Sequence, residues 1–166
     1  MIKLTTAGRA SVADILTQQL FHFAWGSGDS AWTASDLGDT DQTALTAEIS
    51  RKLITVIGFA MPDSGGSIVI PVGTGSETYS RSVTPTPYLY LKASVLPAED
   101  VGAEIRELGV FIKPTLANGV PAGQSYLLPA DVSDAGQLLA YSRFEPMTKT
   151  SSTRHEFEFV LPILGA

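Results

Sequence analysis

The sequence predicts a mainly β or α+β fold, an antiparallel β-sandwich with one or two short helices near the N-terminus. Short segments in which apolar and polar residues alternate predict strands, and glycine- and proline-rich stretches separate them. Helical periodicity occurs in the first third of the chain. This order of elements disfavours a parallel doubly wound fold. No period of about 20 to 50 residues recurs, so we expect residues 1–166 to form a single domain.

Two segments near the N-terminus are predicted to be helical. In residues 6–17, apolar side chains recur on one helical face, and the threonines at the start can cap the first turn. In residues 41–49, Asp41 offers an N-cap, and leucine and isoleucine follow at a spacing of four. We therefore expect a short amphipathic helix in the first segment and a second short helix or helical turn in the other.

The remaining predicted elements are strands. Each is a short run of β-branched, aromatic or alternating apolar residues that ends at glycine, proline or polar residues. These runs are 20–25, 53–61, 67–72, 88–95, 104–112, 137–144 and 154–163. Glycine, serine, threonine and proline dominate 73–87, so we predict an extended loop or arm there.

Composition excludes several classes of function. Hydrophobic residues make up 44% of the chain, as in folded globular domains. The net charge of −6 repels phosphate backbones, so we expect no binding to nucleic acid. The absence of cysteine removes disulfides, thiolate metal sites and cysteine nucleophiles. No apolar run reaches the roughly 18 residues of a membrane span, and no secretory leader is recognisable, so we expect a soluble, unexported protein without membrane contact.

Candidate metal ligands are sparse, and we predict neither a metal nor another cofactor. His22 and His155 stand alone within predicted strands, where no metal motif surrounds them. Four aspartates between Asp29 and Asp41 could offer oxygen ligands to Ca²⁺, but their spacing is not that of a calcium-binding hand. We interpret them as a solvated acidic loop. The glycines at 26–28 are not followed by the third glycine of a dinucleotide fingerprint, so we interpret that segment as a turn.

The sequence gives no support to catalysis, and we predict that the chain is not an enzyme. No glycine-framed serine elbow is present. Glu104 with Glu107, and Glu156 with Glu158, could act as the acid and base of a glycosidase, but strand spacing alone provides no cleft. We expect these carboxylates to face solvent, with Arg106 or Arg154 as partners across strands. A small hydrolase acting on cell-wall polymer remains an open alternative.

Three stretches follow one another in an order that resembles a known family. The first runs from Leu4-Thr5-Thr6-Ala7-Gly8-Arg9 through a helix to Trp25-Gly26-Ser27-Gly28. The second has the form Thr-x-Leu-x-x-Glu-x-x-Arg and contains Thr43, Leu45, Glu48 and Arg51. The third contains Glu107, Leu108, Gly109 and Phe111, and Gly136-Gln137-Leu138-Leu139-Ala140-Tyr141 follows it. In this order the stretches resemble the N-terminal attachment module of phage tail-collar fibre proteins and related tail or baseplate components.

The resemblance implies a structural bacteriophage protein of the tail, collar or baseplate that docks other virion proteins. It implies partners among tail, neck or baseplate proteins, a homo-oligomer in the virion and synthesis in the host bacterial cytoplasm. Fibre proteins of this kind usually continue into a long shaft and a receptor-binding tip. The printed sequence stops soon after its last predicted strand, so we expect an adaptor.

Aromatic and charged residues on predicted strands and loops are the candidate interface. Such residues are common in protein interfaces. The set comprises Trp32, Tyr79, Tyr88, Tyr90, Arg106 and Glu107. We expect Trp25 to belong to the core instead. The alternative function is a carbohydrate- or receptor-binding β-sandwich module of a tail fibre, with aromatic residues and the acidic loop forming a shallow sugar site.

Overall fold

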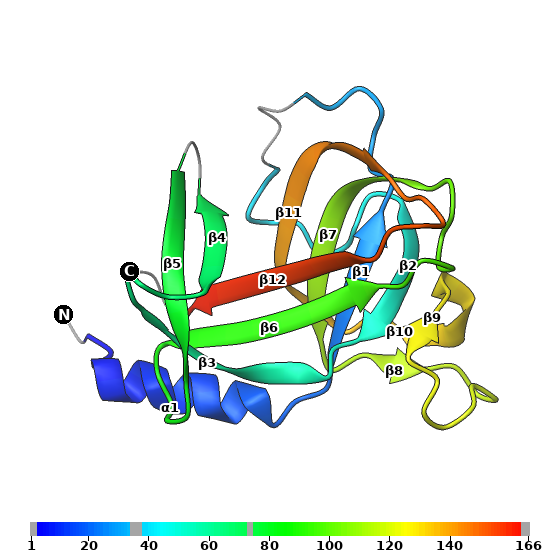
Figure 1. The fold of residues 1–166 in the computed structure, drawn as a ribbon. Helices are drawn as coiled ribbons and strands as arrows, with labels where there is room; N and C mark the ends of the chain where they lie inside the picture. The colour runs from blue at the N-terminus through cyan, green and yellow to red at the C-terminus, as the bar shows by residue number, and fades with distance from the viewer. Residues whose placement is uncertain (1–2, 34–37, 73–74, 164–166) are drawn as a thin grey trace. The chain divides into compact units, whose positions relative to one another are not determined.

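A computed structural model describes residues 3–33, 38–72 and 75–163 of the chain (Figure 1). They fold into antiparallel β-sheets, with one α-helix and one short 3₁₀ helix in this described part. The chain forms two compact units and passes between them after Gln19, Ile54, Ala93 and His155. Neither unit is a continuous piece of sequence, so we retain the single-domain organisation as our proposal.

The first unit combines the α-helix with a five-stranded sheet of order β12-β6-β3-β5-β4. Its elements are α1 (Thr6–Thr17), β3 (Val56–Pro62), β4 (Ile68–Val72), β5 (Gly75–Ser82), β6 (Tyr88–Val95) and β12 (His155–Pro162). The Thr5 hydroxyl accepts a hydrogen bond from the backbone of Gly8, 3.1 Å away, and so caps α1. The helix contacts β3, and its Ala13 is fully buried.

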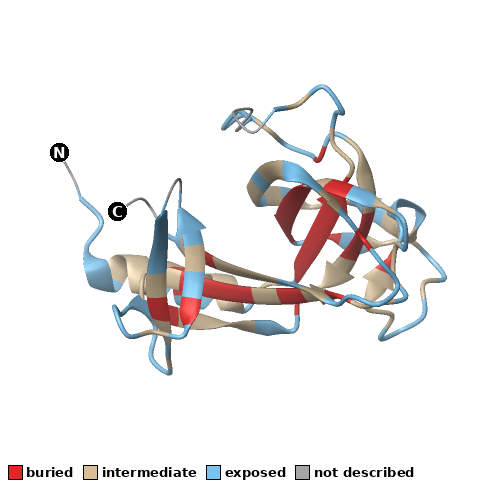
Figure 2. Cartoon of the chain, turned by 45° about the horizontal axis from the view of Figure 1, so that its top comes forward, coloured by how far each residue is buried: buried red, intermediate tan, exposed pale blue. Residues whose placement is uncertain are grey.

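The second unit is built on a five-stranded sheet of order β11-β7-β1-β2-β9. Its strands are β1 (Phe21–Gly26), β2 (Glu48–Leu53), β7 (Glu104–Ile112), β9 (Tyr126–Leu127) and β11 (Gln137–Thr148). A small sheet joins β8 (Thr115–Leu116) to β10 (Val132–Asp134), and the 3₁₀ helix η1 (Pro129–Asp131) precedes β10. Every residue of the central strand β1 is buried. In each unit the buried residues lie mainly on strands (Figure 2).

The predicted class of a mainly β, antiparallel fold with a short helix near the N-terminus is confirmed. Strands β6 and β7 have the predicted ranges 88–95 and 104–112. Trp25 belongs to the core, as expected: it is fully buried, and its Nε1 donates to Asp100 Oδ2 over 2.8 Å. In the described part of the chain no helix has the length and apolar character needed to cross a membrane.

The short helix or helical turn predicted at 41–49 is wrong. A turn at 40–41 is followed by bends and irregular backbone up to residue 47, and Glu48 already begins β2. The reason is tertiary, because the backbone N–H groups of Thr46 and Ala47 donate to the Glu107 side chain and not to a helical carbonyl. Local helix propensity is weaker than such pairing within a folded sheet.

Two further sequence boundaries differ from the structure. The apolar run 53–61 is not one strand, because the chain leaves the second unit after Ile54 and starts β3 at Val56. The segment 73–87, predicted as a loop or arm, contains β5 over Gly75–Ser82, while residues 73–74 lie outside the described part. Strand β5 pairs with β3 on one side and β4 on the other. Backbone pairing stabilises this strand even though Tyr79 is its one buried side chain.

Candidate functional site

The six predicted interface residues are distributed over both units. Three belong to the second unit: Trp32, Arg106 and Glu107. Three belong to β5 and β6 of the first unit: Tyr79, Tyr88 and Tyr90. These last three, here called the tyrosine cluster, pack together around a small core that also contains Ala60, Ile68 and Val160. The fold therefore brings half of the predicted set to one place.

The tyrosine cluster has a buried and a more accessible part. The rings of Tyr79 and Tyr88 lie 5.7 Å apart, centroid to centroid. Tyr79 and Tyr90 are only 6% and 4% exposed, whereas Tyr88 is half-buried. Tyrosine combines a large apolar ring with a polar tip, which suits it to surfaces that contact other proteins. Tyr88 is thus the member of the cluster with the most accessible ring.

Carboxylates hold the hydroxyl groups of the two buried tyrosines. Tyr79 donates to Glu77 Oε2, and Tyr90 donates to Glu158 Oε1 over 2.8 Å. Burial, reinforced by the Glu77 carboxylate, raises the pKa of Tyr79 to about 12. The Tyr79 hydroxyl therefore stays protonated at neutral pH and remains a hydrogen-bond donor to Glu77.

Two cations accompany the cluster on the same sheet. The guanidinium carbon of Arg81 lies 4.2 Å from the centroid of the Tyr90 ring, a cation–π contact. The Lys92 ammonium pairs with Glu156 at 2.9 Å and with Glu158 at 3.3 Å. Glu156 and Glu158 of β12 therefore pair with a cation on another strand, as predicted, and Lys92 of β6 is a partner of both.

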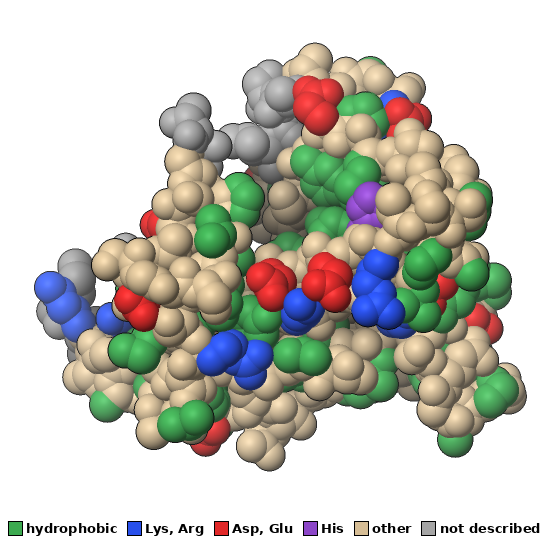
Figure 3. Space-filling view, viewed as in Figure 1, with side chains coloured by type: hydrophobic (Ala, Val, Ile, Leu, Met, Phe, Trp, Pro, Cys, Tyr) green, Lys and Arg blue, Asp and Glu red, His purple; other side chains and the backbone are tan. Residues whose placement is uncertain are grey.

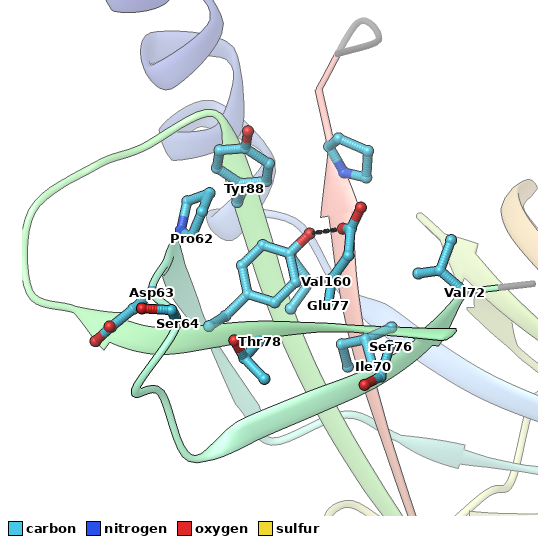
Figure 4. Close-up of a pocket in the computed structure, with 12 residues that line it drawn as sticks. Pro62, Asp63, Ser64, Ile70, Val72, Ser76, Glu77, Thr78, Tyr88 and Val160 are labelled. Atoms are coloured by element: carbon cyan, nitrogen blue, oxygen red, sulfur yellow. Dashed lines mark hydrogen bonds between the residues drawn. The ribbon is translucent and has the colours of Figure 1, made fainter. Parts of the chain in front are cut away.

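A cavity of about 750 Å³, here called the hairpin cavity, opens beside Tyr79 and Tyr88. The β4–β5 hairpin, the turn after β3, and the end of β12 bound it. Figure 4 shows Glu77 accepting its hydrogen bond on one side of the donating ring, with Tyr88 and Pro62 on the other side. Glu77 and Asp63 were not among the residues predicted from the sequence. The period-two spacing of Glu77, Tyr79 and Arg81 was the signal for the strand that places Glu77 beside Tyr79.

Trp32 of the second unit lies against an arginine. The guanidinium carbon of Arg143 is 3.9 Å from the centroid of the Trp32 ring, and Arg143 also donates to Gln42. The ring covers Gly28, whose φ is +59°, and an added Cβ there would lie 2.3 Å from the ring. The glycine turn predicted at 26–28 therefore supports Trp32, which is half-buried.

Arg106 and Glu107 have different surroundings although they are neighbours. Arg106 pairs with Glu104 at 3.0 Å near the surface. Glu107 is only 1% exposed and accepts hydrogen bonds from Thr46 N at 3.1 Å and Ala47 N at 2.8 Å. The expectation that Glu107 faces solvent is wrong, because its carboxylate replaces the missing backbone partners of the preceding turn. We leave Glu107 out of the proposed interface.

The residues that carried the family resemblance meet inside the second unit. Arg51 is 2% exposed, and its Nε and Nη2 donate to the two carboxylate oxygens of Glu48 over 2.7 and 2.6 Å. Its guanidinium lies 4.5 Å from the centroid of the Phe111 ring, and Phe111 packs with Leu45. We call Leu45, Glu48, Arg51, Glu107 and Phe111 the motif cluster. Its contacts show that these motifs maintain the fold of the unit.

Glycines of the same motifs allow close approach within the cluster. A Cβ added to Gly26 would lie 2.5 Å from Glu107 Oε1 and 2.6 Å from the Ala47 carbonyl oxygen. A Cβ on Gly109 would come within 3.0 Å of Leu45 and Phe111. The motif glycines therefore leave room for the Glu107 carboxylate and for the side chains of Leu45 and Phe111.

His22 lies in the buried strand β1 and is 2% exposed. Burial, with the nearby charge of Arg51 as a second cause, lowers the pKa of His22 from 6.5 to about 4. Within the described residues, its Nδ1 has no hydrogen-bond partner. His22 is therefore neutral in the folded protein at neutral pH and acts as a core residue.

Acidification should destabilise the fold through His22. His22 takes up a proton near pH 6.5 in the unfolded chain but only near pH 4 in the folded chain. The free energy of unfolding is therefore highest above pH 6.5 and falls as the pH drops from 6.5 to about 4. We expect a loss of about 3 kcal/mol. Urea unfolding of wild type and His22→Gln at several pH values measures it, since carboxylate titration is common to both. Parallel pH profiles for the two proteins would contradict this role.

The other candidates for chemistry do not assemble into a site. No group of three His, Asp or Glu side chains in the described ranges could hold a metal ion. Of the acidic loop, Asp29 and Asp39 accept hydrogen bonds from their own turns, and Asp36 lies outside the described residues. On the face drawn in Figure 3, acidic and basic side chains occur in small mixed groups without an extended basic patch.

Comparison with known protein families decides the identity of the chain. Residues 1–163 match the family model described as baseplate wedge 3 tail fiber network component. The chain belongs to this family. Membership identifies a structural component of the phage baseplate and tail fibre network, and hence of the virion. The resemblance to phage tail and baseplate components is thereby confirmed. No curated protein matches the chain.

Proposed function

We propose that this member of the baseplate wedge 3 tail fiber network family is a non-enzymatic docking module. It would bind neighbouring baseplate or tail fibre proteins through the hairpin cavity and Tyr88. The observation that carries the proposal is the cavity of about 750 Å³ beside a half-buried tyrosine. Cavities that accept an anchoring side chain are where interface hot spots cluster.

Exposed apolar residues extend this surface. Val69 and Val72 of the edge strand β4 are 54% and 50% exposed. An edge strand with exposed apolar side chains is a surface that a protein normally covers or uses for association. Docking of a partner over β4 and the cavity would remove this apolar area from water.

Replacing Tyr88 by alanine should weaken docking. We expect a loss of about 2 kcal/mol, or roughly 30-fold in Kd, because the ring is the accessible anchor beside the cavity. The measurement is biolayer interferometry of the full chain against each purified baseplate and tail fibre protein of the same phage. Tyr141→Ala is the matched control, because Tyr141 is a half-buried tyrosine of the second unit whose hydroxyl donates to Asp39. Equal affinities for the two variants would exclude Tyr88 as the anchor.

Position and copy number complete the proposal. We propose that several copies assemble in the virion after synthesis in the host cytoplasm. Immunogold electron microscopy of intact particles, with an antibody against the purified chain, should place gold at the baseplate. Light scattering of the purified chain tests self-association, and a strictly monomeric chain at all concentrations would argue against the homo-oligomer.

A carbohydrate-binding role is the second candidate. The hairpin cavity combines the Tyr88 ring with the carboxylates of Asp63 and Glu77, a combination that can bind a sugar. Docking is favoured because the rings of Tyr79 and Tyr90 are buried and offer no stacking surface. Binding on a glycan array that Tyr88→Ala abolishes would promote the carbohydrate role.

A further inference from the structure

We propose that the hairpin cavity receives a lysine or arginine side chain from a neighbouring network protein. The inference rests on the proposed docking function and adds the chemistry of the partner. It follows from four properties of the cavity: its charge, the orientation of Glu77, its apolar walls and the proline in β4.

The charged residues that line the cavity are all acidic. Its lining includes Asp63 and Glu77 and no lysine or arginine, and neither carboxylate has an ion-pair partner among the described residues. Hydrogen bonds from Ser80 and Gly65 lower the pKa of Asp63, which keeps it anionic. A cation entering here would meet uncompensated negative charge.

A second cavity shows the same bias. This cavity of about 380 Å³ is lined by Val69 and Pro71 of β4 and by Glu156, Phe157 and Glu158 of β12. Lys92 pairs with both of these glutamates. Glutamate side chains therefore line the second cavity as well, and a basic partner suits both cavities.

Glu77 is prepared to accept a donor. The Tyr79 hydroxyl holds one of its carboxylate oxygens, Oε2, and the high pKa of Tyr79 keeps that proton in place. In the described part of the chain the other oxygen, Oε1, accepts no hydrogen bond, and the side chain is exposed. An incoming ammonium or guanidinium would form a charge-assisted hydrogen bond to an already oriented carboxylate.

The walls of the cavity suit the stem of such a side chain. Ile70 and Val72 of β4 and Val160 and Pro162 of β12 contribute apolar surface to the lining. Lysine and arginine place an aliphatic stem against apolar surface and keep the charged head beside a polar group. The cavity thus matches both parts of a long cationic side chain.

The edge strand favours recognition by side chains. Pro71, opposite Ser76, removes a backbone donor from the middle of β4, so a partner cannot pair along this strand without a break. A second copy of this chain is a poor occupant of this acidic cavity, because its own net charge is −6, and the proposed self-association would use another surface. The occupant is therefore a basic segment of a different protein.

Short overlapping peptides that cover the other structural proteins of the particle provide the probe. The full-length chain is applied to the peptide array, and Kd values of the bound peptides are measured in solution. We expect the bound peptides to share a lysine or arginine whose change to glutamine weakens binding about tenfold. Glu77→Gln should cause the same loss, and the two changes together should cost little more than either alone.

The controls separate this inference from the docking function. Glu145→Gln removes an exposed carboxylate of the second unit and should leave Kd unchanged, whereas Glu77→Lys should abolish binding of basic peptides. Peptides that bind without a shared basic residue, or that bind Glu77→Gln as well as wild type, would overturn the inference and leave docking intact. If no peptide binds, the inference fails, and the Tyr88 measurement with whole proteins still decides docking.

Discussion

Replacing Arg51 by alanine is expected to lower the free energy of unfolding by about 3–5 kcal/mol, the range for breaking a buried ion pair. Arg51 is 2% exposed, pairs with Glu48 through two hydrogen bonds and also donates to the Ala135 carbonyl over 3.1 Å. Its removal leaves Glu48 without its cation and takes the guanidinium away from Phe111. The largest stability loss among charged residues should therefore come from a residue of the second motif.

Urea unfolding of purified variants at pH 7 measures this effect. Arg51→Lys should recover only part of the loss, because an ammonium cannot reproduce the two parallel hydrogen bonds of the guanidinium. Arg106→Ala is the control, since Arg106 pairs with Glu104, whose side chain is 47% exposed, and surface pairs contribute about 0–1 kcal/mol. Equal stabilities of the Arg51 and Arg106 alanine variants would refute the role of the buried pair.

Replacing Glu107 by alanine should cost about 3 kcal/mol, because two backbone donors lose a charged acceptor that is itself buried. The carboxylate accepts from Thr46 N and Ala47 N, which belong to the turn that precedes β2. Glu107→Gln should cost less, because its amide oxygen can still accept one hydrogen bond. The loss in Glu107→Ala should therefore reflect local loosening of residues 40–47.

Hydrogen exchange together with urea unfolding tests this second prediction. Amide protons of Thr46 and Ala47 should exchange much faster in Glu107→Ala than in wild type. Amide protons of β6 in the first unit should exchange faster only to the extent that the free energy of global unfolding falls. Glu104→Ala is the control, because Glu104 is an exposed glutamate at the start of the same strand. Unchanged exchange at Thr46 and Ala47 would contradict the bridging role of Glu107.

Arg51 and Glu107 both belong to the motifs that resemble the phage tail and baseplate family. A shared motif is often taken to mark a binding site. Here Glu48, Arg51 and Phe111 contact one another inside the second unit, and Glu107 is buried against the backbone of Thr46 and Ala47. The features that we propose for docking, Tyr88 and Glu77, lie outside the three motif stretches. In this chain the motif residues stabilise the fold, whereas the proposed contact surface has no motif.

The sequence by itself determined the antiparallel class, the first helix and most strands, because period-two and helical patterns are local. It also indicated the family, because the resemblance depends only on the order of the three motif stretches along the sequence. Tertiary structure alone decided that 41–47 is not helical, because its backbone donors are satisfied by Glu107, which is about 60 residues away in sequence. It also made 75–82 a strand, since pairing with two neighbours outweighs a polar composition. Long-range contacts likewise join Tyr79 and Tyr88 to Val160 and form the hairpin cavity, which no local pattern specifies.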